Sequence, residues 1–212
     1  MRILDNCDPL WLQWARKLQA LAQNGLTYTE NGYDLDRYRQ IRLIALEMMA
    51  KGSGSSLTRI EEIFEGEVGY QTPKVDTRGV VFREDRLLLV REKINGLWTL
   101  TGGWVDPNET PREAVEREVM EESGHEVRAE KMLALFDRSR QGYHPPHPYR
   151  VFKLFIRCRL IGGNAKDSLE TEEASFLGED EIPELSLARV TGPQITRMFE
   201  HLRHPEWPTD LD

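Results

Sequence analysis

The residues best able to do chemistry form an acidic group that follows a pair of glycines. Glu118 lies three residues before Glu121 and four before Glu122, so the three side chains would be neighbours on a helix. Like charges at this spacing repel by roughly 0.2–0.5 kcal/mol per pair. Hard divalent cations take oxygen ligands, and a crowded group of carboxylates is typical of such a site. We therefore expect these glutamates to bind Mg²⁺ or Mn²⁺, helped by a backbone carbonyl of Gly102 or Gly103.

The helix that must carry the glutamates has clear start and stop signals. Thr110 is a good N-cap, Pro111 suits the first helical position, and Glu113 completes a Thr-x-x-Glu capping box. Gly124 can take the left-handed conformation that ends a helix. The sequence therefore predicts a short helix between Thr110 and Gly124.

The glutamates fall beside the apolar side of this helix. At about 100° per residue, they lie next to the stripe that contains Val115 and Val119. An ordinary solvated acidic face, the alternative interpretation, would lie opposite that stripe. Arg117 lies beside Glu121 and could reach Glu109, and we expect the Arg117–Glu109 pair to fix the loop against the helix as a structural contact.

The glycine pair predicts a close approach of the backbone to the site. Trp98–Thr101 alternates like a short strand, and Gly102-Gly103 follows it directly. A plain tight turn is the alternative for two glycines. A strand, a glycine turn and a capped helix in this order would place a backbone carbonyl beside the helix carboxylates.

These residues together resemble the signature of the Nudix hydrolases, G-x5-E-x7-R-E-U-x-E-E-x-G-U, in which U is a bulky apolar residue. The matching positions are Gly103, Glu109, Arg117, Glu118, Val119, Glu121, Glu122 and Gly124. The last apolar position holds His125, which departs from the pattern without changing a charged position. A pattern of this length is a specific signal.

The resemblance extends to a subgroup that has a helical N-terminal extension and includes ADP-ribose and CDP-choline pyrophosphatases. The segments that carry it are 75–82, 98–104, 144–147 and 181–186. Thr101 stands where many members have a proline before the glycines. The resemblance implies an α+β fold, a Nudix-type α/β/α sandwich around a mixed sheet. It also implies metal-dependent hydrolysis of the diphosphate bond in a nucleoside diphosphate linked to another group.

The general base remains open between the signature helix and a later loop. A metal-activated water needs no covalent enzyme intermediate, and no nucleophile signature is visible. We take Glu118 and Glu121 on the helix and Glu170 and Glu173 in the loop as catalytic candidates. A solvated acidic turn is an equally good interpretation of the loop residues.

Several cationic and aromatic residues are candidates for substrate binding. Arginines near the first strands could face a diphosphate, a tryptophan beside the glycines could stack on a base, and the loop histidines could contact either group. Exposed placement or core packing is the alternative for each of them. The candidates are Arg78, Arg91, Trp104, His144 and His147.

Composition excludes some classes of function. The 212 residues carry a formal net charge of −8, which argues against a broad nucleic-acid-binding surface. Cys7 and Cys158 are too few for a disulfide framework, and we expect Cys158 to pack within a strand. The sequence shows no membrane-spanning run and no targeting segment, so we expect a cytoplasmic protein.

The chain divides by pattern near residue 70. Residues 1–69 read as a helical extension, whose first helix we expect to end at Asn24-Gly25. Residues 70–205 read as the Nudix domain, with a last helix at 191–202. Its strands are expected at 75–82, 87–91, 98–101, 127–136, 149–160 and 173–177. Since three short helices bury little by themselves, we expect the extension to form a homodimer or to cover the substrate.

Two other functions compete with a small-molecule pyrophosphatase. A non-catalytic nucleotide-sensing module of the same fold would not need every acidic position, and this chain keeps them all. An enzyme that acts on RNA ends fits less well, because the chain is acidic and lacks clustered basic residues.

Overall fold

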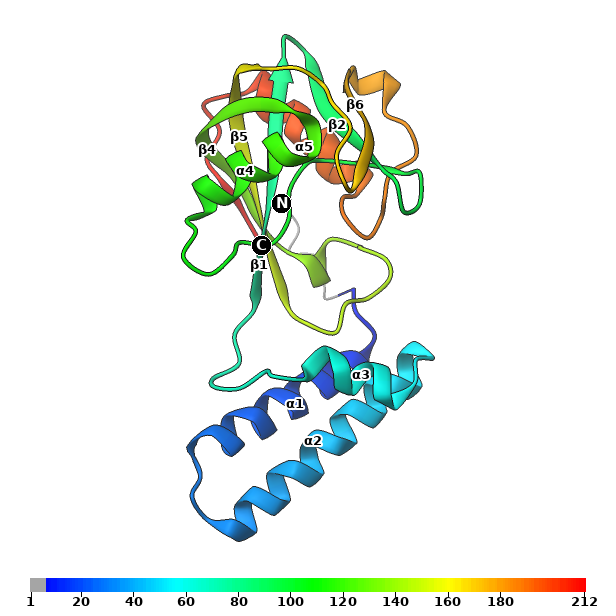
Figure 1. Ribbon diagram of the computed structural model, residues 1–212, viewed down its shortest axis with the longest axis vertical. Helices are drawn as coiled ribbons and strands as arrows, with labels where there is room; N and C mark the ends of the chain where they lie inside the picture. Colours follow the sequence, from blue (N-terminus) through cyan, green and yellow to red (C-terminus); the bar gives the residue numbers. More distant parts are fainter. Residues whose placement is uncertain (1–6) are drawn as a thin grey trace. The chain divides into compact units, whose positions relative to one another are not determined.

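The described part of the chain, residues 7–212 of a computed structural model, separates into two compact units (Figure 1). Lys74–Pro145 and Val151–Asp212 form a sheet unit, and residues 7–73 with Pro146–Arg150 form a helical unit. The predicted extension began at residue 1, so its first six residues lie outside the described part. Each unit is described by itself below.

The helical unit contains three α-helices among its described residues: α1 (Leu10–Tyr28), α2 (Gly32–Ser53) and α3 (Leu57–Phe64). Their apolar positions recur every three or four residues, so each helix presents one face to a shared core. The side chains of this core are Leu12, Ala15, Leu46, Met49, Ala50, Ile60 and Phe64.

Helix α1 runs past the point where the sequence predicted its end. Asn24-Gly25 was expected to terminate it, yet the helix continues to Tyr28. The Tyr38 ring of α2 covers Gly25 so closely that a Cβ there would lie 2.4 Å from the ring. Gly25 therefore permits close packing of α1 and α2, and tertiary contact overrides its low helix propensity.

The segment Pro146–Arg150 also belongs to the helical unit. Arg16 of α1 donates from Nε to the Pro148 carbonyl at 3.2 Å. The ring centroids of Tyr149 and Phe64 are 5.0 Å apart. Tyr149, which the sequence placed at the start of a strand, therefore lies before strand β5 (Val151–Gly163) and packs on the helical core.

Within the described residues, the sheet unit is built on seven strands in the order β3-β2-β1-β5-β4-β7, with β6 paired to β2. Strands β1 and β5 are parallel, whereas β4 and β5 are antiparallel, so the sheet is mixed as predicted. Their bounds are β1 Lys74–Arg83, β2 Arg86–Glu92, β3 Trp98–Thr99, β4 His125–Asp137, β5 Val151–Gly163, β6 Thr171–Leu177 and β7 Asp210–Leu211.

Alternation along the strands supplies two apolar faces. Val80 faces a core beneath α5 (Gly192–Arg203), and its neighbour Val81 faces a core beneath α4 (Pro111–Ser123). Successive side chains of a strand point to opposite faces, so both faces need a helix to cover them. Cys158 packs within strand β5, as expected, and its side chain lies in the core on the α4 side. Figure 1 shows the resulting layers, with α4 and α5 on opposite faces of the sheet.

The sheet unit continues past residue 205, where the sequence placed its end. Strand β7 pairs in parallel with β4, and Asp210 anchors it to α5. Both guanidinium Nε and Nη2 of Arg197 donate to the Asp210 carboxylate at 2.6 and 2.7 Å. Nε2 of His201 lies 2.9 Å from the same carboxylate. These contacts hold the last residues on the sheet.

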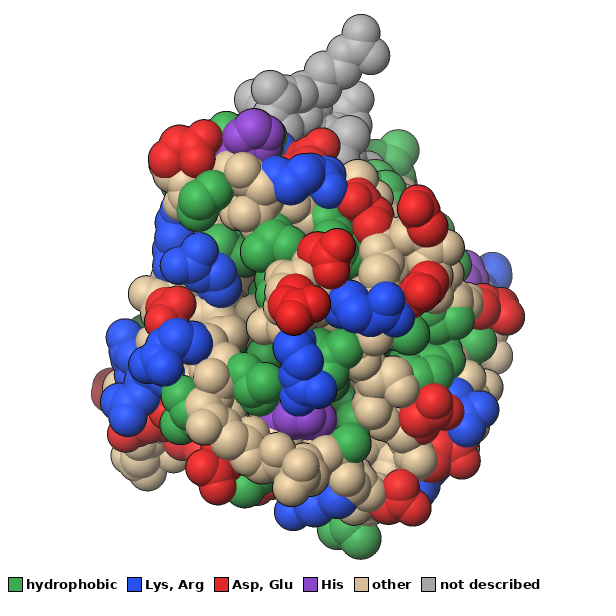
Figure 2. Space-filling model, turned by 90° about the horizontal axis from the view of Figure 1, so that it is seen from above, with side chains coloured by type: hydrophobic (Ala, Val, Ile, Leu, Met, Phe, Trp, Pro, Cys, Tyr) green, Lys and Arg blue, Asp and Glu red, His purple; other side chains and the backbone are tan. Residues whose placement is uncertain are grey.

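The face drawn in Figure 2 carries both acidic and basic side chains, and several of the basic ones gather along its left edge. Within residues 7–212, no helix has the length and apolarity needed to cross a membrane.

Candidate metal and phosphate site

Backbone hydrogen bonds connect the glycine turn, Gly102-Gly103, to strand β1. Thr77 N donates to the Gly103 carbonyl at 2.8 Å, and Gly79 N donates to the Thr101 carbonyl at 2.9 Å. Gly102 has a φ of +136°, a conformation that side chains with a Cβ rarely adopt. A Cβ on Gly102 would also lie 2.0 Å from the Thr77 carbonyl oxygen. Glycine is therefore required at this position.

Helix α4 begins and ends as its sequence predicts. Thr110 Oγ1 accepts from Glu113 N at 3.3 Å, and the Glu113 carboxylate accepts from Thr110 N at 2.8 Å. Gly124 ends the helix in the left-handed conformation, with a φ of 76°. These caps fix where the helix starts, and so which glutamates face the glycine turn.

Of the three glutamates predicted to bind a metal, Glu118 and Glu122 lie against the glycine turn. Oε1 of Glu118 would be 2.7 Å from a Cβ on Gly103, so the glycine makes room for this carboxylate. Gly102 N donates to Oε2 of Glu122 at 2.8 Å. Burial raises the pKa of Glu118, and it raises the pKa of Glu122 to about 7. Burial disfavours the charged form of both carboxylates, and a bound cation would offset that cost.

Glu121 is more exposed than this pair, and Arg117 connects it to Glu118 and Glu109. The Glu121 side chain is 59% exposed and accepts from Arg117 Nη1 at 3.0 Å. The same Nη1 donates to Glu118 at 2.9 Å. Arg117 Nε and Nη2 both donate to Glu109, at 2.7 and 2.9 Å. The predicted Arg117–Glu109 contact is present, and it ties the loop to α4.

The donor types fit a hard divalent cation, although no complete ligand cluster is assembled. In residues 7–212, no three His, Cys, Asp or Glu side chains lie close enough together to hold a metal ion. Glu118 and Glu122 nevertheless supply two desolvated carboxylates on one side of a glycine turn, the oxygen chemistry that Mg²⁺ and Mn²⁺ take. The Gly103 carbonyl is bonded to Thr77 N, which leaves Gly102 as the better carbonyl candidate.

The two glutamates predicted as bases in a loop differ in location, because Glu170 precedes β6 whereas Glu173 belongs to that strand. Glu173 on β6 pairs with Arg91 Nη2 at 3.1 Å, so both Glu173 and the candidate Arg91 are already engaged. Glu172 pairs with Arg91 Nε at 3.2 Å. Glu170 instead lies close enough to Glu122 for its charge to raise the pKa of that carboxyl.

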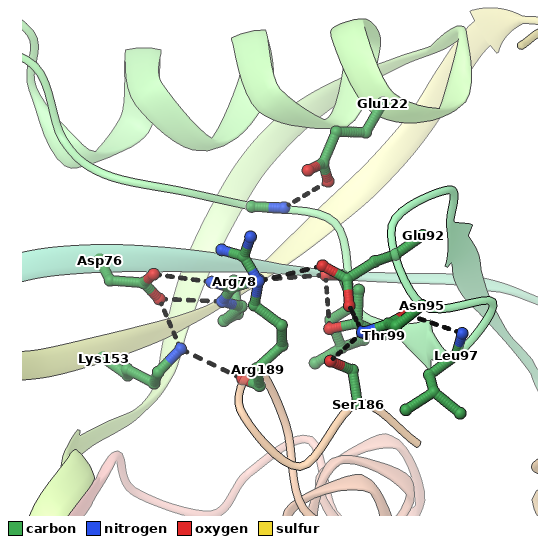
Figure 3. A network of polar contacts seen from close by, with 12 residues as sticks. Asp76, Arg78, Glu92, Asn95, Leu97, Thr99, Glu122, Lys153, Ser186 and Arg189 are labelled. Carbon is green, nitrogen blue, oxygen red and sulfur yellow. Dashed lines mark hydrogen bonds and ion pairs between the residues drawn. The ribbon is translucent and has the colours of Figure 1, made fainter. Parts of the chain in front are cut away.

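A buried ionic network lies beneath the glycine turn (Figure 3). Arg78, 1% exposed, donates from Nε and Nη2 to both carboxylate oxygens of Asp76 at 2.9 and 2.7 Å. Its Nη1 donates to the Leu100 carbonyl at 3.3 Å. Lys153 Nζ donates to Asp76 at 3.1 Å. Arg78, a predicted substrate contact, thus has every guanidinium nitrogen bonded inside the protein.

The network continues to Arg189, in the loop between β6 and α5, which was not among the predicted site residues. Lys153 Nζ also donates to the Arg189 carbonyl at 3.1 Å, and Arg189 Nε donates to Glu92 at 3.1 Å. Asn95 Nδ2 donates to the Glu92 carboxylate at 3.1 Å and to the Ser186 hydroxyl oxygen at 3.4 Å. The available signal was weak: charged residues inside apolar strands, and an arginine just after the 181–186 segment.

The remaining substrate candidates lie in three different places. Trp104 follows the glycine turn, forms an isolated antiparallel β-bridge with Asp76 through its backbone, and is 45% exposed. His144 is exposed, and its backbone N donates to the Leu187 carbonyl at 3.1 Å. His147 belongs to the helical unit, where its carbonyl accepts from Arg16. Their roles in substrate binding stay predictions.

Comparison with known families finds two matches that together span most of the chain. The model described as the NUDIX domain matches residues 72–199. The model described as UDP-X-like, N-terminal oligomerisation domain matches residues 9–64.

Individual relatives agree with these matches. The chain is 42% identical over 202 residues to the Bacillus subtilis (strain 168) protein named "Putative ADP-ribose pyrophosphatase YjhB", covering 95% of this chain and 97% of that one. A solved ADP-ribose pyrophosphatase of Streptococcus suis is 40% identical with a TM-score of 0.60, over 66% of this chain and 100% of its own. A solved UDP-X diphosphatase is 26% identical with a TM-score of 0.62, over 95% and 98%.

Proposed function

Because the chain belongs to the Nudix family, we propose that it hydrolyses the diphosphate bond of a nucleoside diphosphate linked to a second group, as in ADP-ribose. The observation that carries this proposal is the pair of desolvated carboxylates, Glu118 and Glu122, packed against the Gly102-Gly103 turn. Nudix hydrolases as a family use divalent metal ions. Buried acids beside an open backbone are suited to such an ion and a phosphate.

The proposed metal ligands are Glu118, Glu121 and Glu122 with a carbonyl of the glycine turn. A bound Mg²⁺ or Mn²⁺ would offset phosphate charge and lower the pKa of an attacking water. Arg117 holds Glu118 and Glu121 from one side and Glu109 from the other. Arg117 therefore fixes the position of the loop relative to helix α4, and we propose no chemical step for it.

Glu170 is the better candidate for a loop base. A general base must reach the water that it deprotonates, and Glu173 is held by Arg91. The charge of Glu170 acts on Glu122, which supports a location near the proposed metal ligands. We propose Glu170 ahead of Glu173, with Glu118 and Glu121 kept as the helix alternatives.

The two competing functions have less support. A nucleotide-sensing module would not need desolvated carboxylates at the glycine turn. A hydrolase of RNA ends would gain from a basic surface, whereas this chain has a formal net charge of −8 and the face in Figure 2 carries acidic side chains among its basic ones. CDP-choline remains a candidate substrate from the sequence, and UDP-linked compounds join it because a solved relative is a UDP-X diphosphatase.

A substrate panel tests the function. We would incubate the full chain with ADP-ribose, CDP-choline, a UDP-sugar, a dinucleotide polyphosphate, an oxidised nucleotide and capped RNA, with Mg²⁺, with Mn²⁺ or with a chelator. We expect metal-dependent release of a nucleoside monophosphate from one of the first three. Glu118→Gln and Glu122→Gln should each lower kcat by about 100-fold or more, whereas exposed Glu126→Gln should not. Full activity in the chelator would contradict the proposal.

We further propose that the helical unit forms a homodimer. Helix α1 exposes Leu10, Trp14, Leu21 and Tyr28, each more than half exposed, at spacings of four, seven and seven residues. Repeats of seven keep one stripe of a helix facing a partner helix. The match to an oligomerisation domain over residues 9–64 supports a second copy as that partner. A cytoplasmic location stays a prediction from the sequence.

A further inference from the structure

We propose that Arg189 binds a phosphate group of the substrate, an inference that rests on the function proposed above. Arg189 lies in the loop between β6 and α5, and its side chain is 42% exposed. Of its guanidinium nitrogens, Nε donates to Glu92. Among the contacts of the described residues, none reaches the two terminal amino groups, Nη1 and Nη2.

The three other arginines of the candidate site already bond to groups of the protein through their guanidinium nitrogens. Arg78 uses all three guanidinium nitrogens on Asp76 and Leu100. Arg117 uses its three on Glu109, Glu118 and Glu121. Arg91 pairs with two glutamates of β6. Arg189 alone among these four keeps a pair of donors available for an anion.

Arg189 is also held in place at both ends. Its carbonyl accepts from Lys153 Nζ at 3.1 Å, and its backbone N donates to the Ser186 carbonyl at 2.8 Å. Its partner Glu92 is only 10% exposed and is fixed by Asn95. A side chain that is already ordered loses little conformational freedom when it binds a ligand.

The direction of the side chain fits a ligand at the glycine turn. In Figure 3 the guanidinium group of Arg189 extends from its loop toward the side on which Glu122 lies. The planar fork of a guanidinium donates two parallel hydrogen bonds to phosphate oxygens. Glu122 and Arg189 would then act on the same diphosphate, the acid through a cation and the arginine directly.

Binding and turnover of matched variants test the proposal. We would measure kcat and KM for the substrate found in the panel, and the calorimetric affinity for inorganic pyrophosphate with Mg²⁺. The variants are Arg189→Gln and Arg189→Lys. The control is Arg86→Gln, because Arg86 is 43% exposed, much like Arg189, and its ion pair is with Glu181. Circular dichroism and thermal unfolding confirm that each variant is folded.

We expect Arg189→Gln to weaken pyrophosphate binding by about tenfold or more and to lower kcat/KM by a similar factor. Arg189→Lys should recover part of the loss, because the charge remains while the fork is lost. Arg86→Gln should change neither quantity by more than about twofold. The proposal is overturned if Arg189→Gln matches the control, or if the wild-type protein does not bind pyrophosphate.

The two proposals can fail separately. A wild-type protein that cleaves nothing in the panel would refute the function, and the pyrophosphate titration would still decide whether Arg189 binds phosphate. Cleavage that is unchanged in Arg189→Gln would refute the role of Arg189 and leave the function standing.

Discussion

Single positions beneath the glycine turn decide whether the site can form. Gly102 takes a left-handed backbone in contact with the Thr77 carbonyl, and Arg78 and Lys153 share the buried carboxylate of Asp76. Each position is constrained from several sides at once. Substitutions there should therefore affect stability as well as activity, and the two effects have to be measured apart.

A methyl group at residue 102 should be poorly tolerated. Gly102→Ala would place a Cβ 2.0 Å from the Thr77 carbonyl, at a φ of +136°. We expect a loss of about 1–3 kcal/mol in unfolding free energy, from strained backbone, together with a large loss of activity. Gly192→Ala is the control, because nothing lies within 4 Å of a Cβ there. Equal stability of the two variants in urea denaturation would contradict this account.

The stability of the protein should rise with pH in a window set by Lys153. Burial, together with the nearby charge of Arg78, lowers the pKa of Lys153 to about 7, against the raising effect of Asp76. An unfolded lysine titrates near 10.5, so between pH 7 and 10.5 the unfolded state binds more protons. The free energy of unfolding should then increase with pH, by at most about 1.4 kcal/mol per unit.

Lys153→Met should remove this contribution. Urea denaturation at pH 7 and pH 9 would measure it, with exposed Lys166→Met as the control. If the wild type and Lys153→Met showed the same change of unfolding free energy between the two pH values, the depressed pKa would be wrong.

At the scale of elements, the two helices that cover the sheet both begin at a threonine, but the hydrogen bonding of the two hydroxyls differs. The hydroxyl of Thr110 bonds to Glu113 and caps α4. The hydroxyl of Thr191, at the start of α5, is buried and has no hydrogen-bond partner among the described residues. The cap of α4 matters more for function, because this helix carries the proposed metal ligands.

Replacing each threonine by valine should separate the two helix starts. Thr110→Val loses a cap and should destabilise the protein by about 1 kcal/mol. Thr191→Val removes a buried, unpaired hydroxyl and should be neutral or stabilising by up to about 1 kcal/mol. Thermal unfolding checks both, and a larger loss for Thr191→Val than for Thr110→Val would show that the assigned hydrogen bonds are wrong.

At the scale of the whole molecule, the helical unit has more apolar surface than its own core uses. Helix α1 buries one face in that core and exposes the stripe of Leu10, Trp14, Leu21 and Tyr28 on another. Exposed apolar side chains that recur along one side of a helix mark an interaction site more often than an isolated exposed residue does.

Charges placed in the stripe should dissociate the proposed dimer. Trp14→Glu with Leu21→Glu should shift the molecular mass in light scattering from that of two chains to that of one, because buried charge opposes association. Ile94→Glu is the control, since Ile94 is 88% exposed in the sheet unit. A wild-type protein with the mass of a single chain at all concentrations would rule out the dimer.

The signature helix could be predicted from sequence because its determinants are local. Caps, glutamate spacing and the Arg117–Glu109 contact all lie within the stretch from Gly102 to Gly124, and backbone periodicity brings such residues together in any context. The order of strands and helices likewise predicted an α/β sandwich, and the family resemblance implied its mixed sheet. The sequence missed β7 and the full length of α1.

The buried network could be decided only by tertiary structure. Asp76 and Lys153 meet because parallel pairing of β1 and β5 makes them register partners. Arg189 meets Glu92 across 97 residues of sequence. No local periodicity encodes strand register or loop approach, since both depend on how the whole sheet closes on its core. The sequence by itself therefore determined the acidic helix, and the fold decided which arginine remains available to a phosphate.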